Sequence, residues 1–211
     1  MNPPAITTVP RLKNSAPDFA IPAPGRIVRV SEALDGQIVT GSGEAEARIE
    51  NGHALADPSR DLLKITVVNR YADAPPAVAF VRGVGLREGA IASSVAHDCH
   101  NLVAVGASDE DIARAVNLLI ENQGGICVLD GQGGSEVLPL PIAGLMSNAP
   151  AAEVAAAYSH LTRRARDLGS PLKAPFMTLS FLALLVIPSL KLGDRGLFDG
   201  NRFEFTPVFT G

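Results

Sequence analysis

The stretch "LVAVGASDEDIARAVNLLIENQGGICVL" (Leu102–Leu129) contains the clearest pattern of secondary structure in the chain. Ser108 is a good helix cap, and the three acidic residues that follow it suit the positive end of a helix. Apolar residues then recur at helical spacing, at Ile112, Val116, Leu119 and Ile120. Because Gly124 and Gly125 end the helix between two short apolar runs, the stretch predicts a strand–helix–strand unit that is long enough for a crossover connection.

Short apolar runs also lie on both sides of this unit. A run rich in β-branched residues predicts a strand over Leu62–Val68, after a turn at Asn51-Gly52. The runs "AVAFV", "IASSVA" and "LVAVG", with the glycine-rich "GVGLREGA" among them, predict further strands. "DGQGGS" predicts a hairpin turn, and "RFEFTPVF" alternates like a last strand. The glycines around Gly36 to Gly43 predict a loop.

Two later segments complete the predicted fold. An apolar stripe predicts a second helix from about Ala151 to Leu168, before a Gly-Ser-Pro stop. "PFMTLSFLALLVIP" is apolar all round and is therefore expected in the core, although it and "LPLPIAGLMS" are also candidates for an exposed apolar surface. The pattern predicts an α+β fold, with a mixed, largely antiparallel β-sheet flanked by helices.

Composition favours one globular domain with an arm. The chain has 211 residues, of which 46% are hydrophobic and 19% charged. Six prolines fall between Pro3 and Pro24, and this density predicts an extended segment that lies on a surface. We therefore expect an arm over residues 1–24 and an α+β domain over residues 25–211.

Charge and hydropathy limit the partners. The formal net charge is -4 and no Lys/Arg cluster is present, which disfavours nucleic acid. The longest apolar run, Phe181 to Ile187, is far shorter than the roughly 20 residues of a membrane-spanning helix. The first residues lack a secretory signal, and Cys99 and Cys127 do not suggest a disulfide framework, so we expect a cytoplasmic protein without a membrane partner.

The stretch "SVAHDCHN" (Ser94–Asn101) is the main candidate for chemistry, because it holds two of the four histidines. His97 and His100 are weak candidates for metal ligands, with Asp98 or Cys99 as a third ligand. Residues three apart point to opposite faces of a strand, so both imidazoles converge only if the stretch is a loop or a helix. The chain offers few further ligands, and we expect no metal bound by this chain alone.

Two other interpretations of the same stretch stay open. Ser94 or Cys99 is a candidate nucleophile with either histidine as its base, although no glycine-flanked nucleophile elbow surrounds them. Alternatively the stretch is the tip of a hairpin, where Asp98 and Asn101 have the right turn chemistry and the side chains bind backbone groups. We expect the hairpin tip.

Several long motifs together resemble a known family. "GAIASSVAHDCHN", "DEDIARAVNLLIENQGG", "LPLPIAGLMS", "PFMTLSFLALLVIPSLKL" and "DRGLFD" are similar to the C-terminal domain of bacterial adenine deaminases, and "DFAIPAPG" and "DLLKITVVNRY" resemble the segments that lead into it. The resemblance covers about Asp18 to Phe209. Cys99 lies at a position where the family pattern has a serine.

The resemblance implies an activity that needs more than this chain. In that family adenine is hydrolysed to hypoxanthine and ammonia by a metal-dependent amidohydrolase barrel that precedes this domain. The barrel's histidine-x-histidine motif is missing here, so a divalent metal (manganese, iron or zinc) is expected in the barrel, and no catalytic residue can be transferred to this chain.

Three functions follow as hypotheses. In the first, the chain is a subunit or remnant of an adenine deaminase that needs a barrel partner. The polar hairpin tip then faces the partner's active-site mouth as a substrate-side or interface loop, with adenine as a candidate ligand. In the second, it is a free-standing, non-catalytic binding or scaffold protein that self-associates. In the third, it is a small metalloenzyme that uses His97, Asp98 and His100.

Overall fold

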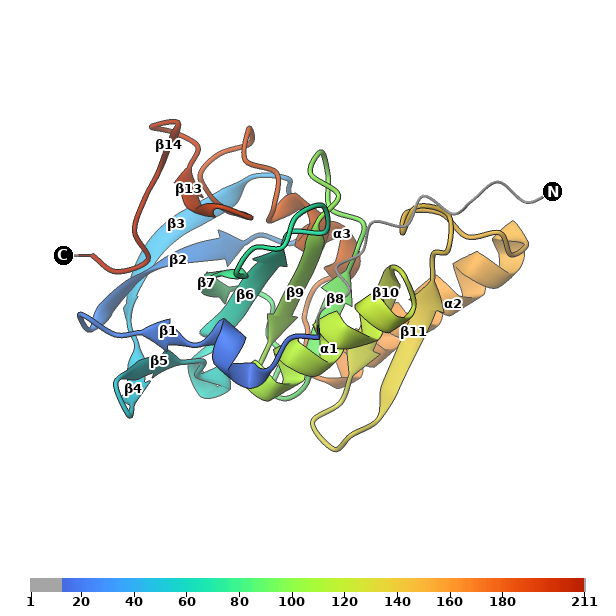
Figure 1. Ribbon diagram of the computed structural model, residues 1–211, viewed down its shortest axis with the longest axis horizontal. Helices are drawn as coiled ribbons and strands as arrows, with labels where there is room; N and C mark the ends of the chain where they lie inside the picture. Colours follow the sequence, from blue (N-terminus) through green and yellow to red (C-terminus); the bar gives the residue numbers. More distant parts are fainter. Residues whose placement is uncertain (1–12, 211) are drawn as a thin grey trace.

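The computed structural model describes residues 13–210. One mixed sheet of eight strands forms the centre of the domain (Figure 1). Its strands, in the order in which they lie side by side, are β11 (Ser135–Pro139), β10 (Gly125–Leu129), β8 (Ala90–Ser93), β9 (Leu102–Gly106), β6 (Leu63–Val68), β7 (Ala77–Arg82), β2 (Ile27–Ala33) and β3 (Thr40–Glu46). Neighbouring strands are antiparallel except for β2 and β7, which are parallel, so the predicted α+β class with a largely antiparallel sheet is confirmed.

Helices and two small sheets cover this central sheet. The helices are α1 (Asp109–Glu121), α2 (Ala151–Asp167) and α3 (Pro175–Phe181), with the short 3-10 helices η1 (Ala16–Phe19) and η2 (Pro58–Arg60). One small sheet has the order β1 (Ile21–Pro22), β5 (His53–Leu55), β4 (Arg48–Glu50), and the other has the order β12 (Leu190–Gly193), β13 (Gly196–Asp199), β14 (Glu204–Phe205). No helix within residues 13–210 combines the length and the apolar character that a membrane crossing requires.

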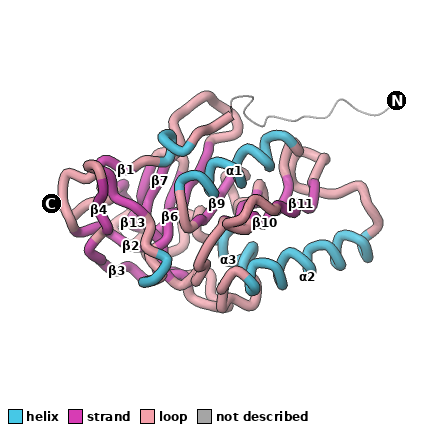
Figure 2. The backbone as a smooth tube through the Cα atoms, turned by 90° about the horizontal axis from the view of Figure 1, so that it is seen from below, coloured by secondary structure: helices cyan, strands magenta, loops and turns pink. Residues whose placement is uncertain are grey.

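The domain has three layers, as Figure 2 shows. Helix α1 packs on one face of the sheet, and α2 and α3 pack on the other. On β6, Leu63, Ile65 and Val67 face α2 and α3, whereas Val68 faces α1. Both faces of the central strands are buried, so β9 is a continuous apolar run, whereas β6 carries the buried polar residues Lys64 and Thr66 on the face toward α1.

The predicted strand–helix–strand unit is confirmed. Strands β9 and β10 both pair antiparallel with β8, so α1 makes a crossover connection between two parallel strands that flank a third. The Ser108 hydroxyl caps α1 by accepting a hydrogen bond from the backbone N–H of Asp111 at 3.1 Å. The cap and the buried apolar face fix where the helix begins and how it lies on the sheet.

A buried ion pair joins the N-terminal segment to this unit. The ammonium of Lys64, on β6, donates to both carboxylate oxygens of Asp109 at 2.7 and 2.8 Å and to the carbonyl oxygen of Phe19 at 3.2 Å. Burial lowers the pKa of Lys64 and raises that of Asp109. Part of the predicted arm, residues 1–12, lies outside the described residues. Its described part is attached to the domain through the fully buried Phe19 and the pairing of β1 with β5.

The loop predicted around Gly36 to Gly43 is wrong in its second half. Residues from Thr40 onward form β3, which pairs with β2 along its whole length. The side chain of Glu32 on β2 lies over Gly41 and Gly43, where a β-carbon would come within 2.4 and 2.6 Å of its carboxylate oxygens. The glycines thus leave room for a side chain of the neighbouring strand and do not mark a turn, and a single sequence does not reveal that neighbour.

The last predicted strand is also wrong in extent. Within "RFEFTPVF" only Glu204–Phe205 is a strand, because residues 200–203 form a turn. Phe203 and Phe205 are 70% and 43% exposed. The other apolar segment, "PFMTLSFLALLVIP", is largely buried as predicted, but Met177 and Val186 are exposed, so part of it lies on the surface.

Lys191 on β12 is a second buried cation. Its side chain is fully buried, and its ammonium donates to the carbonyl oxygens of Ile38 at 2.8 Å and Phe181 at 3.0 Å. Burial lowers the pKa of Lys191 to about 8, because the ammonium loses its water and the two carbonyl oxygens compensate for that loss only in part. This lysine joins the end of α3 to the β2–β3 connection.

The Lys191 pKa predicts a pH dependence of stability. Its pKa rises from about 8 in the folded protein to the ordinary 10.5 on unfolding, so the unfolded chain binds more protons between these pH values. The free energy of unfolding should therefore increase with pH across this window, by about 3 kcal/mol from this group. Urea unfolding between pH 7.5 and 10 measures this increase in the free energy of unfolding. Lys191→Met should lose the increase, whereas Lys173→Met, at an exposed lysine, should keep it; equal slopes in all three proteins would contradict the assignment.

Candidate functional site

The stretch from Ser94 to Asn101 connects β8 to β9 at one end of the central sheet (Figure 1). The two strands are antiparallel neighbours, so the stretch is a hairpin loop, as predicted. Asp98 and His100 have left-handed backbone conformations, with φ of 67° and 50°. Asp and His tolerate this region better than most residues, which explains their use at the tip.

Ser94 is buried and binds backbone groups. Its side chain is fully buried, and its hydroxyl accepts a hydrogen bond from the backbone N–H of Gly125 at 2.8 Å. The same hydroxyl lies within hydrogen-bonding distance of the carbonyl oxygens of Gly125 and Gly144. The oxygen is therefore occupied by backbone groups of β10 and the loop after β11, and it has no histidine partner of the kind that activates a serine nucleophile.

The two histidines of the loop have different surroundings. The imidazole of His97 stacks on the ring of Phe181, with centroids 4.1 Å apart and planes 18° apart, and its Nδ1 atom is buried without a hydrogen-bond partner. The backbone N–H of His97 donates to the carbonyl oxygen of Ser180 at 3.4 Å. His100 holds the next loop through its own carbonyl oxygen, which accepts from Arg70 at 3.2 Å. Each histidine is thus attached to a different neighbouring segment.

Cys99 is a poor candidate nucleophile. Its side chain is partly buried, and burial raises the pKa of its thiol, with a smaller contribution from the carboxylates of Asp194 and Asp98. A raised pKa keeps the sulfur protonated near neutral pH, whereas a reactive cysteine needs the thiolate. The other cysteine, Cys127, is completely buried with its pKa raised to about 12.

Arg70 connects three loops at this end of the sheet. It is 4% exposed, and its guanidinium donates to the carbonyl oxygens of His100 and Ala143. Its backbone N–H donates to the side-chain oxygen of Asn101 at 3.2 Å. A β-carbon at Gly144 would lie 2.9 Å from the guanidinium, so glycine is needed for this close approach. The predicted turn residue Asn101 therefore joins two loops.

A second contact brings the β12–β13 turn to the same place. The Asn69 side chain donates to the Asp194 carboxylate at 2.6 Å, and its oxygen accepts from the backbone N–H groups of Tyr71 and Ala72 at 2.8 and 3.0 Å. The structure adds Asn69, Arg70 and Asp194 to the site. Two sequence signals could have pointed to them. The polar pair Asn69-Arg70 directly follows the buried strand β6, and the charged pair Asp194-Arg195 lies between the short strands β12 and β13.

We call the connections around Arg70 the loop cluster: residues 69–76, 94–101, 140–149 and 194–195. It combines an exposed Asp98 at the tip of the β8–β9 loop with exposed apolar side chains such as Tyr71 and Met146. Within residues 13–210, no three His, Cys, Asp or Glu side chains come close enough to hold a metal ion. The set of His97, His100 and Asp98 or Cys99 therefore does not fit a catalytic zinc, which needs three protein ligands. The cluster is suited to contact a ligand or another protein surface.

A family model and the similar proteins both point to the same family. A family model described as the adenine deaminase C-terminal domain matches residues 37–204. The chain is 51% identical over 217 residues to an adenine deaminase of Methanosarcina barkeri, covering 99% of this chain and 39% of that protein. It is 57% identical over 194 residues to an adenine deaminase of Salinibacter ruber, covering 91% of this chain and 35% of that protein. The chain thus spans little more than a third of these relatives.

The Arg70 contacts predict the effect of a conservative change. Arg70→Lys keeps the charge but cannot reach both carbonyl oxygens, and should lower the free energy of unfolding by about 1–3 kcal/mol. Arg26→Lys, at an arginine whose side chain is 77% exposed, should change it by less than about 0.5 kcal/mol. Urea unfolding measures both, and equal stabilities of the two variants would mean that Arg70 does not hold the loops.

Proposed function

The chain belongs to the adenine deaminase C-terminal domain family, and on that premise we propose that it acts as the non-catalytic part of an adenine deaminase. In this proposal a metal-dependent amidohydrolase barrel, on the same or a separate polypeptide, hydrolyses adenine to hypoxanthine and ammonia. The proposal is supported by the share of the relatives that this chain matches, because the chain corresponds to 33% to 39% of the length of three adenine deaminases.

The side chains of the loop cluster also support a reaction that takes place in the barrel and not in this chain. Deamination of a purine needs an activated water, and a bound metal supplies one by lowering the pKa of that water. The described residues do not fit a metal, Ser94 is bound to backbone groups, and the Cys99 thiol has a raised pKa. The manganese, iron or zinc would be held by the barrel, and no step of the reaction is assigned to this chain.

We assign the β8–β9 loop to the mouth of the barrel's active site. Loops on rigid scaffolds commonly carry recognition groups. Arg70 fixes the base of this loop, while Asp98 is exposed at its tip. A carboxylate accepts hydrogen bonds from an exocyclic amino group such as that of adenine. In this proposal Asp98 orients the substrate at the entrance, with His97 and His100 beside it.

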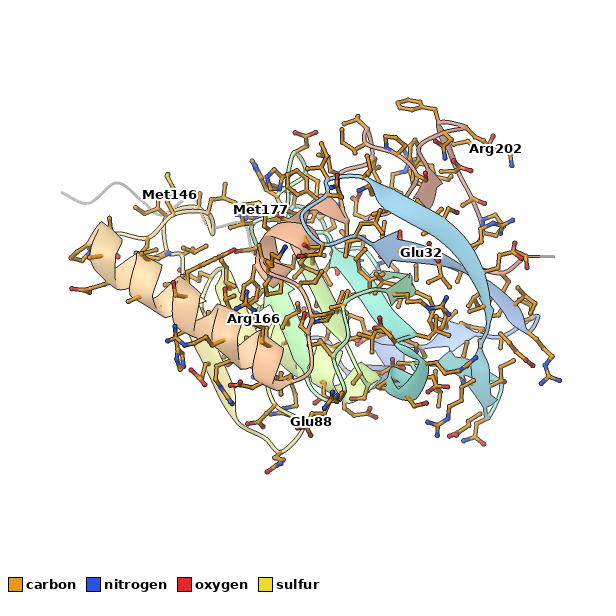
Figure 3. The ribbon with its side chains drawn as sticks, turned by 180° about the vertical axis from the view of Figure 1, so that it is seen from behind. Glu32, Glu88, Met146, Arg166, Met177 and Arg202 are labelled. Carbon is orange, nitrogen blue, oxygen red and sulfur yellow. The ribbon has the colours of Figure 1, made fainter. Side chains whose placement is uncertain are left out.

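A second candidate function, a self-associating scaffold, has support from exposed apolar side chains. Tyr71, Met146, Met177 and Val186 are 57%, 58%, 48% and 61% exposed, and Figure 3 shows Met146 and Met177 in the same upper part of the view. A groove of about 700 Å³ lies between Met146 and the first turns of α2. Light scattering separates the two functions, because a stable homo-oligomer without affinity for any barrel supports the scaffold.

A chimera tests the proposed function. The corresponding third of the Methanosarcina barkeri enzyme is replaced by this chain, and ammonia release from adenine is measured with manganese. The chimera should be active and this chain alone inactive. Asp98→Asn keeps a residue that tolerates the left-handed conformation, and should lower kcat/KM about tenfold to a hundredfold through loss of a charged hydrogen bond.

The control is His53→Ala, since His53 lies on the small sheet β1-β5-β4. It should leave kcat/KM unchanged. Turnover by the lone chain would overturn the non-catalytic role, and a fully active Asp98→Asn chimera would overturn the assignment of the loop to the active-site mouth.

A further inference from the structure

The end of helix α3 holds the β8–β9 loop from a side that Arg70 does not reach. The ring of Phe181, the last residue of α3, is the surface on which the His97 imidazole stacks, with centroids 4.1 Å apart. The carbonyl oxygen of Ser180 accepts a hydrogen bond from the backbone N–H of His97 at 3.4 Å. The backbone and the ring of His97 are thus attached to the same helix end, whereas Arg70 holds the loop at His100.

This helix end is itself fixed by strand β12. The carbonyl oxygen of Phe181 accepts a hydrogen bond from the buried ammonium of Lys191 at 3.0 Å. The carbonyl oxygen of Leu182 accepts one from the backbone N–H of Leu192, also at 3.0 Å. Lys191 and Leu192 belong to β12, all of whose residues are buried. The Phe181 ring therefore has a rigid base, and the imidazole stacked on it is held in one plane.

The two nitrogens of the His97 ring have different surroundings. Nδ1 is buried and has no hydrogen-bond partner among residues 13–210. A buried N–H group without an acceptor is rarer in proteins than a buried acceptor without a donor, so the proton of the neutral ring belongs on Nε2. Nε2 makes no hydrogen bond to the described part of the chain and is not buried. His97 therefore presents one N–H donor at the surface of the loop.

We propose that His97 determines specificity for the purine by donating a hydrogen bond from Nε2 to a ring nitrogen beside the adenine amino group, and that Phe181 positions it. The inference rests on the proposed function, in which the next residue, Asp98, accepts a hydrogen bond from that amino group. Adenine has a ring-nitrogen acceptor on each side of its amino donor, N1 on one side and N7 on the other. A carboxylate acceptor next to an imidazole donor is complementary to such a pair. Hypoxanthine has an oxygen in place of the amino group, so the Asp98 carboxylate disfavours the product.

The isolated chain tests where the proton lies. At about pH 8.5, where imidazole is ordinarily neutral, the nitrogen-15 chemical shifts of His97 should show a proton on Nε2 and none on Nδ1. The ring current of Phe181 should also shift the ring protons of His97. Phe181→Leu should remove this shift, and Phe181→Tyr should keep it. A proton on Nδ1 would contradict the inference.

The chimera tests the recognition of adenine. His97→Ala should raise KM about threefold to tenfold and leave kcat unchanged, because the lost contact binds the substrate and the transition state equally. Phe181→Leu should raise KM in the same way and add nothing to His97→Ala, whereas Phe181→Tyr should keep the wild-type KM. The control is Phe176→Leu, which makes the same change on α3. The ring of Phe176 packs against Tyr158 on α2, so KM should stay unchanged.

Two analogues identify the nitrogen that accepts the hydrogen bond. 1-Deazaadenine and 7-deazaadenine each lack one of the two ring nitrogens, and their inhibition constants are measured with the wild-type and His97→Ala chimeras. His97→Ala should weaken the binding of one analogue and leave the other unchanged, because a hydrogen bond that is already missing cannot be lost again. An unchanged KM, or an equal effect on adenine and both analogues, would overturn the role of His97 while the proposed function stands. A wild-type chimera that releases no ammonia would overturn both.

Discussion

The buried guanidinium of Arg70 is the contact on which the candidate site depends. A cation at 4% exposure must have its donors satisfied, and Arg70 uses carbonyl oxygens from the loop of His100 and the loop of Ala143. Its backbone also binds Asn101. The Arg70 residue thus fixes the positions of three loops relative to one another. These contacts also fix the position of the exposed tip of the β8–β9 loop.

Three non-glycine residues of the loop cluster have left-handed backbone conformations. Asp98, His100 and Ala143 have φ between 50° and 67°. Such positions cost on the order of 1–3 kcal/mol each and persist only where their surroundings hold them. The opposite face of the molecule has the features of a stabilising core, such as the Lys64–Asp109 pair under α1. The packed body thus supports the left-handed residues of the loop cluster, which is the surface proposed to contact a partner.

The sequence predicts the body of the fold better than its surface. Helix α1 is predictable because its cap, acidic first turn and apolar stripe are all local. The contacts of Arg70 with His100 and Ala143 span 30 and 73 residues, so no local pattern reveals them. The same holds for the glycines of β3, because the Glu32 side chain that packs over them comes from the neighbouring strand. The sequence predicts that "SVAHDCHN" is a hairpin tip. It does not predict which of its side chains are buried, such as Ser94 and Asn101, and that Asp98 is exposed, because this depends on tertiary contacts.

The central claim is that the loop cluster, with the exposed Asp98 at its tip, faces the catalytic part of an adenine deaminase. Hydrogen–deuterium exchange of the lone chain and of the chimera compares this surface with the rest of the domain. The account predicts slower exchange in the chimera at residues 94–101, with no change at the β4–β5 hairpin. Equal exchange at residues 94–101 in both proteins, with new protection at β4–β5, would contradict it.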